Sequence, residues 1–184
     1  MIGAKMHKAT RWSLMAMVCG AFLSLSASGQ EKATSAASAR KTVPQVELKD
    51  LNGKPVKIHE LKGQVVVISF WATWCVPCLQ ELGFLQKYYE KYQKDGLTVL
   101  AISTDGPETR SRVRSVARRK GWSLPVLLDE AGTAVSNLNP RGSTPYTLFI
   151  DRQGRLANAH EGYKAGDEEG YEKLIQKLVA EPKT

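Results

Sequence analysis

Sulfur and imidazole ligands are scarce in this sequence of 184 residues, and their scarcity limits what the protein can do. The chain has three cysteines and three histidines, and all four methionines lie within the first 17 residues. A structural zinc site needs four ligands, and a copper carrier would more naturally keep thioether or imidazole ligands near its cysteines. We therefore expect no metal site, with a Zn or Cu(I) chaperone built on two cysteines as a less favoured alternative.

The chain also lacks the pattern of a nucleic-acid-binding protein. Its formal net charge is +8, but its basic residues are not interleaved with aromatic residues as they are in single-strand binders. A basic cluster between Arg110 and Lys120 is interpreted as a solvated helix face, with a docking surface for an acidic partner or anionic lipid as the alternative. We expect no nucleic-acid partner.

The first 29 residues have the composition of a signal peptide. Three basic residues precede an apolar run from 13 to 27 that ends in small residues, as in secretory signals. The run is shorter than the roughly 20 residues that span a bilayer. We predict a signal peptide at 1–29 and export to the periplasm or a similar oxidising compartment, with an uncleaved N-terminal membrane anchor as the alternative.

The rest of the chain has the length of one domain, preceded by a linker. Residues 30–42 are rich in Ala, Ser and Thr and are interpreted as a flexible linker. Residues 43–184 suit a single domain with a substantial core.

Within that domain, short β-like runs alternate with helical periodicity. We expect an edge strand with Pro44 at 43–48, and further strands at 64–71, 96–103, 124–129, 147–151 and 154–162. Helices are expected at 77–93, from an N-cap at Asp105 to 120, and along the apolar stripe from Tyr171 to Val179. This order predicts an α/β fold, with a mixed β-sheet and helices on both faces.

The stretch "FWATWCVPC" places Cys75 and Cys78 where a buried strand gives way to a helix. A disulfide this local would stabilise the fold little. A helix N-terminus stabilises an anion, and cysteines in such places have pKa values of roughly 3.5–7.5 instead of about 8.5. We predict that Cys75 is the nucleophile and that Cys78 resolves its mixed disulfides, while Pro77 fixes the first helical turn.

Several stretches resemble the thioredoxin superfamily, and within it the exported TlpA/ResA-like thiol-disulfide oxidoreductases. They are "VVVISFWATWCVPC", "GLTVLAISTD" and "STPYTLFIDRQG". The resemblance covers roughly 43–179 and implies a thioredoxin-like fold with an extra central βα unit and an N-terminal β extension. It also implies that Pro145 is cis and lies beside the sulfurs, and that the backbone of Thr144 pairs with client polypeptides. Trp74, next to the nucleophile, is expected to line the same site, whereas Trp71 is expected in the core.

Three positions depart from the family pattern. Ser69 stands where thioredoxin has a buried acid, and Gly83 stands where a proline often kinks the first helix. Glu81 matches an acid common in this branch. It is our candidate to accept the proton of Cys78, and a solvated helix residue is the competing interpretation.

The resemblance further implies that the protein reduces disulfides of client proteins in a role like cytochrome c maturation. The sequence shows no flavin or nicotinamide fingerprint, so we expect no cofactor beyond the Cys75–Cys78 disulfide and a membrane thiol relay as the electron donor. We expect a monomer. Oxidation or isomerisation of client disulfides, and a peroxiredoxin-like peroxidase activity, stay open as alternatives.

Overall fold

Strand β3 (Val65–Trp71) is buried along its whole length near the middle of a seven-stranded sheet. The computed structural model describes residues 40–183. Across the sheet the order is β2 (Pro55–Lys57), β1 (Glu47–Asp50), β5 (Val126–Leu128), β4 (Leu97–Ser103), β3, β6 (Tyr146–Ile150) and β7 (Leu156–Glu161). Strands β3, β4 and β5 are parallel, and the remaining pairs are antiparallel. The sheet is therefore mixed, as predicted.

The alternation of side chains along β3 divides the core into two layers. Val65, Val67 and Trp71 belong to one buried cluster, and the intervening apolar residues belong to another. Successive strand residues point to opposite faces of a sheet, so a strand with no polar face must be covered on both sides. Because Ser69 shares the parity of Val67 and Trp71, its side chain faces the first layer.

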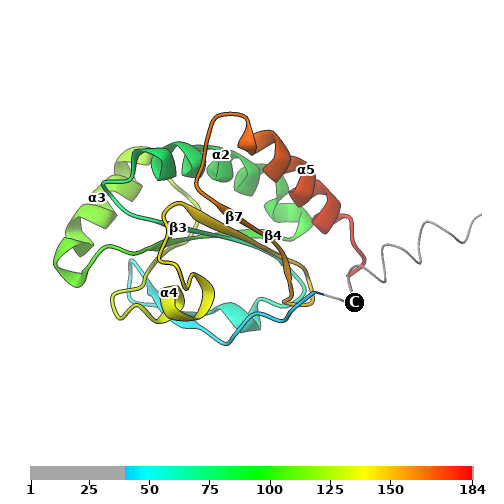
Figure 1. Cartoon of the computed structure of the whole chain (residues 1–184), viewed down its shortest axis with the longest axis horizontal. Coiled ribbons are helices and arrows are strands. Elements are labelled where there is room, and N and C mark those ends of the chain that lie inside the picture. Colours follow the sequence, from blue (N-terminus) through cyan, green and yellow to red (C-terminus); the bar gives the residue numbers. More distant parts are fainter. Residues whose placement is uncertain (1–39, 184) are drawn as a thin grey trace, which may run out of the picture.

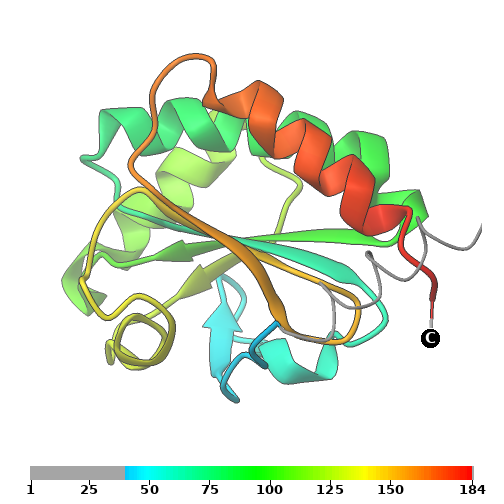
Figure 2. The same cartoon turned by 45° about the vertical axis from the view of Figure 1, so that its right-hand side comes forward.

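Helices cover both faces of the sheet, but unequally. Helices α2 (Val76–Tyr92), α3 (Arg110–Lys120) and α5 (Asp167–Val179) bury their apolar residues in the first layer. The short helix α4 (Thr133–Leu138) and the 3₁₀ turn η1 (Ile58–Glu60) contribute to the second layer. Figures 1 and 2 show α2 and α5 together above the sheet and α4 below it. Two further 3₁₀ turns are η2 (Gln93–Asp95) and η3 (Pro107–Thr109).

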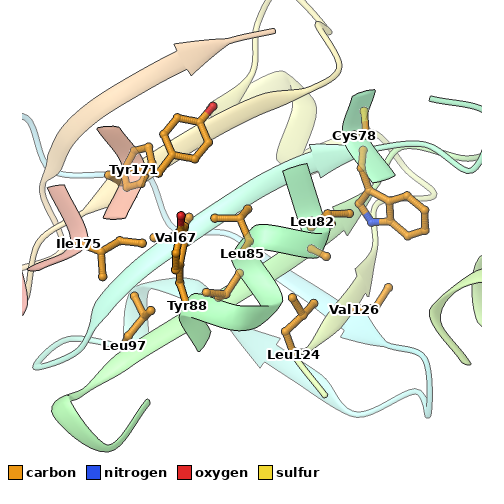
Figure 3. Packing of buried hydrophobic residues seen from close by; sticks show 14 of the residues in the cluster. Val67, Cys78, Leu82, Leu85, Tyr88, Leu97, Leu124, Val126, Tyr171 and Ile175 are labelled. Carbon is orange, nitrogen blue, oxygen red and sulfur yellow. The ribbon is translucent and has the colours of Figure 1, made fainter. Parts of the chain in front are cut away.

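Helix α2 is fixed on the sheet by large apolar side chains. Leu82 and Leu85 are fully buried, and Figure 3 shows Leu85 near Val67 and Leu82 between Leu85 and Cys78, which lies at one end of this layer. Burial of a leucine side chain stabilises the fold by about 1.5–3 kcal/mol. The start of α2, which carries the cysteines, is therefore held by the core itself.

The N-terminal part of the domain corrects one prediction. The expected edge strand at 43–48 is instead β1, which begins at Glu47 and lies between β2 and β5. The edge is formed by β2, which follows the turn after Asp50 and starts with Pro55. Proline has no N–H to donate to a neighbouring strand, and this is tolerated at the first position of an edge strand. The proline of the edge strand is therefore Pro55 and not Pro44.

Two helical predictions also change. Helix α4 is absent from the expected elements, because six residues carry too short a pattern to reveal a periodicity. Asp105 is not an N-cap: Gly106 precedes the 3₁₀ turn η3 without a side-chain cap, and α3 begins at Arg110. The carboxylate of Asp105 is used elsewhere, as described below.

The described chain begins with residues that touch the domain. Arg40 forms ion pairs with Asp151 (2.9 Å) and Glu181 (2.8 Å), and Thr42 pairs with Arg155 in an isolated β-bridge. The predicted signal peptide at 1–29, and residues 30–39 of the predicted linker, lie outside the described residues. Within residues 40–183, no helix has the length and apolar character needed to cross a membrane.

Candidate active site

Cys75 and Cys78 form a disulfide at the N-terminus of α2. Cys75 is the N-cap residue, with extended backbone angles, and its sulfur accepts a hydrogen bond from the backbone N–H of Cys78 at 3.3 Å. The first N–H groups of a helix have no partner within the helix. One of them therefore points at the Cys75 sulfur, where it and the helix dipole would stabilise a thiolate.

The surroundings of the two sulfurs differ. Cys78 is fully buried, whereas Cys75 is 4% exposed. Trp74 and Val76, on either side of Cys75, are the exposed large hydrophobic residues of the described chain, at 71% and 65%. Exposed apolar groups around a reactive atom are typical of a surface that binds another polypeptide. Trp71, in contrast, is fully buried against the ring of Trp122, and its assignment to the core is confirmed.

Glu81 lies one helical turn after Cys78 and is completely buried, so its interpretation as a solvated helix residue is wrong. Its carboxylate accepts three hydrogen bonds, from the hydroxyls of Ser69 (2.7 Å), Thr147 (2.8 Å) and Tyr171 (3.0 Å). These donors come from β3, β6 and α5. Residues three apart on a helix share a face, so Cys78 and Glu81 face the same interior layer.

Burial dominates the electrostatics of this acid. Removal of the carboxylate from water raises the pKa of Glu81 above its ordinary value, although the three hydroxyl donors and His160 act in the opposite direction. Burial, together with the nearby Glu81 charge, also raises the pKa of Tyr171, which keeps that hydroxyl a donor. A carboxyl with a raised pKa is a stronger proton acceptor than an ordinary one and is therefore suited to general base chemistry.

The Thr144–Pro145 peptide bond is cis, as the resemblance implied. Strand β6 begins at the next residue and pairs Tyr146 with Phe70 near the end of β3. Pro145 and Thr144 therefore lie just beyond the end of β3 at which the loop to Cys75 begins. The preceding loop is held by Ser143, which donates to Glu161 at 2.5 Å.

The sequence pattern does not reveal several residues of this site. It assigns Tyr171 to the apolar stripe of α5 and Thr147 to a buried strand, because periodicity cannot show where a hydroxyl finds its partner. It also misses Thr73 and Asp105 as a pair, although both follow the ends of adjacent parallel strands, a signal that could have identified them. Within residues 40–183, no group of three or more His, Cys, Asp or Glu side chains is placed to hold a metal ion.

Comparisons with known proteins agree with this geometry. A model of the AhpC/TSA family matches residues 39–159. A thiol-disulfide oxidoreductase ResA of Bacillus cereus is 31% identical over 140 residues, which are 76% of this chain and 78% of that protein. ResA of Bacillus thuringiensis (strain Al Hakam) is 32% identical over 136 residues, covering 73% of this chain and 77% of that protein.

Solved structures show the same fold. A Chlorobium tepidum protein assigned by name to the DsbE thiol:disulfide interchange proteins superimposes with a TM-score of 0.71 and 26% identity, over 77% of this chain and 97% of that one. A thioredoxin-like protein of Porphyromonas gingivalis gives a TM-score of 0.65 and 34% identity, over 76% and 92%. With its cysteine pair at the start of α2, this chain belongs to the AhpC/TSA family, among its thioredoxin-like thiol-disulfide oxidoreductases.

Proposed function

We propose that the protein, once exported, reduces disulfides of client proteins through the Cys75–Cys78 couple, in a role like cytochrome c maturation. The observation that carries the assigned roles of the two cysteines is the hydrogen bond from the Cys78 N–H to the Cys75 sulfur. This donor favours a thiolate on Cys75 over one on Cys78, which would be a buried charge. We therefore expect Cys75 to react first with the client disulfide and Cys78 to react second.

In the first step the Cys75 thiolate attacks one sulfur of the client disulfide. A mixed disulfide forms, and the other client sulfur leaves as a thiolate. Exposed Trp74 and Val76 support the encounter by burying apolar surface against the client. The backbone of Thr144, before the cis Pro145, is proposed to pair with the client chain, because it lies just beyond the end of β3 at which the cysteine loop begins.

In the second step Cys78 releases the client. Glu81 accepts the proton of the Cys78 thiol, and the resulting thiolate attacks the Cys75 sulfur. The second client sulfur leaves as a thiolate, and the Cys75–Cys78 disulfide forms. The client gains the two electrons that the dithiol loses, so the balance closes without a cofactor. A membrane thiol relay is proposed to return the protein to the dithiol state.

Trapping experiments test the assigned roles. Cys78→Ala should accumulate mixed disulfides with clients, because the nucleophile remains and the resolving thiol is gone. Cys75→Ala is the matched control, with the same substitution one helical turn away, and it should accumulate none. Equal trapping by both variants would refute the order of reaction. Mass spectrometry of the trapped species would identify the clients.

The direction of electron flow needs a separate measurement. Equilibration of the purified protein with glutathione buffers should give a reduction potential below that of the client disulfides, because electrons flow from the couple with the lower potential to the couple with the higher one. A strongly oxidising potential would assign the protein to oxidation or isomerisation of client disulfides. Peroxide consumption that survives Cys78→Ser would instead indicate a peroxidase. Fractionation of cells that express the full chain tests export, and recovery in the cytosol alone would contradict it.

A further inference from the structure

Thr73 and Asp105 form a two-point contact next to the reactive cysteine. The backbone N–H of Thr73 donates to one carboxylate oxygen of Asp105 at 2.8 Å, and its hydroxyl donates to the other at 2.7 Å. Ser103 donates a third hydrogen bond to this carboxylate at 2.9 Å. Asp105 is 8% exposed, so it is a nearly buried acid that receives three donors.

The register of the sheet brings the two residues together. Strands β3 and β4 are parallel, and Trp71 lies opposite Ser103 at their shared end. Two residues further along each chain stand Thr73 and Asp105. Between them, the N–H of Thr104 donates to the carbonyl of Trp71 at 2.9 Å, so the loop after β4 runs along the loop after β3.

The residues held by Asp105 are those that place the nucleophile. The N–H of Cys75 donates to the carbonyl of Ala72 at 3.0 Å, which closes a four-residue turn with Thr73 and Trp74 at its centre. Trp74 is 71% exposed, so its packing contributes little to fixing the turn. The Asp105 carboxylate therefore holds Thr73, the turn residue that immediately precedes the exposed Trp74.

We propose that Asp105 is a positioning residue for disulfide exchange: its carboxylate fixes the turn from Ala72 to Cys75 and so sets the place of the Cys75 sulfur at the start of α2. A shift of the turn would move the sulfur away from the N–H groups that stabilise its thiolate. The inference rests on the proposed function, because it assigns a task within the first chemical step of that reaction.

The test compares three variants of the reduced protein. Asp105→Ala removes the acceptors for Thr73. Asp105→Asn removes the charge but keeps one acceptor oxygen and adds a donor for the Thr73 hydroxyl, so it separates the hydrogen bonds from the charge. Asp151→Ala is the matched control, because Asp151 is also buried and accepts backbone N–H groups. Asp151 follows Ile150, which pairs with Val66 near the opposite end of β3.

Two quantities are measured at a temperature well below the unfolding midpoint of every variant. They are the rate of Cys75 alkylation by iodoacetamide as a function of pH, and the rate of reduction of insulin disulfides. Misplacement of a reacting group by about 1 Å can cost up to about a hundredfold in rate. We expect Asp105→Ala to slow both reactions at neutral pH about tenfold relative to Asp105→Asn, and to raise the thiol pKa of Cys75.

Asp151→Ala should lose stability and keep both rates close to those of the unmodified protein. Equal rates for Asp105→Ala and Asp105→Asn would overturn the proposal, as would a parallel loss of rate in Asp151→Ala. If Asp105→Ala does not fold, Thr73→Val removes one of the two donors and should slow alkylation in the same direction, and an unchanged rate would be equally decisive. Failure of the proposed function looks different: the unmodified protein itself would show no preferential alkylation of Cys75.

Discussion

The hydroxyl of Ser69 on β3 donates a 2.7 Å hydrogen bond to the buried carboxylate of Glu81 on α2. The strand position that holds an acid in thioredoxin thus carries a donor here, and the helix supplies the carboxylate that it binds. Both residues face the interior layer that contains Cys78. A buried acid supplied by helix α2 therefore faces the same interior layer as Cys78.

Replacement of Glu81 by Gln should make the protein more stable than the unmodified form as the pH rises. Burial raises the pKa of Glu81 above the ordinary 4.5, so the folded state holds this proton more tightly than the unfolded chain does. The associated stability is fully present below the ordinary pKa and is lost as the pH rises through the raised folded pKa. Glutamine stays neutral and keeps hydrogen-bonding capacity. Denaturant midpoints measured from acidic to neutral pH test this expectation.

Glu130→Gln is the control for this pH dependence. Arg110 lowers the pKa of Glu130, so its small contribution should appear above the ordinary pKa and disappear as the pH falls. The two variants should therefore show opposite trends. A Glu81→Gln profile parallel to that of the unmodified protein would show that Glu81 ionises as easily in the folded state as in the unfolded chain.

Removal of the strand donor should make Glu81 harder to ionise. Ser69→Ala leaves one buried carboxylate oxygen without its partner, at a cost of about 1–3 kcal/mol in the free energy of unfolding. Because the Ser69 hydroxyl lowers the pKa of Glu81, its loss should move the pH dependence described above to higher pH. Thr147→Val removes another donor to the same carboxylate and should act in the same direction. Opposite shifts in the two variants would contradict this account.

Arg152 connects the end of α5 to the end of the sheet where β3 and β4 begin, which is opposite the cysteines. Its guanidinium is almost completely buried, and it donates to four carbonyl groups, those of Gly63, Asp95, Val179 and Glu181. A lysine cannot reproduce this planar set of donors. Arg152→Lys should therefore lower the free energy of unfolding by about 2 kcal/mol, through carbonyls left unpaired. Chemical denaturation measures this loss.

Arg141 offers the matched comparison for Arg152. It pairs with Glu161 at 2.7 Å, but its side chain is 78% exposed. Arg141→Lys should change the free energy of unfolding by less than about 0.5 kcal/mol, as exposed substitutions usually do. Similar losses in Arg141→Lys and Arg152→Lys would show that burial of the guanidinium does not matter.

Gly83 lies in the interior of α2 with open space where a methyl group would be. Gly83→Ala should raise the free energy of unfolding by about 0.5–1 kcal/mol, because alanine loses less conformational freedom in a helix. Gly96→Ala should do the opposite, since Gly96 has a φ of +93° and its new methyl would lie 2.7 Å from the Arg152 side chain. Thermal unfolding of both variants decides the point, and destabilisation by Gly83→Ala would be incompatible with an open site.

The local sequence determined the elements that have strong patterns. The apolar run that ends at Trp71 indicates a buried strand, which is β3. The predicted start of α2 differs from the observed one by a single residue. The same local pattern placed Cys75 at a helix N-terminus, where a thiolate is stabilised. Short elements were less predictable. Helix α4 has only six residues, and neither β1 nor β2 carries a sequence pattern that shows which of them lies at the edge of the sheet.

The sequence by itself thus determined the chemistry of this protein, because a strand followed by a turn, two cysteines and a helix start is a local arrangement. The tertiary structure alone decided the surroundings of that chemistry. Ser69, Thr147 and Tyr171 meet at Glu81 from three elements, and Thr73 meets Asp105 across two loops. Such contacts depend on sheet order and register, and a buried polar group finds its partner only when distant segments pack together.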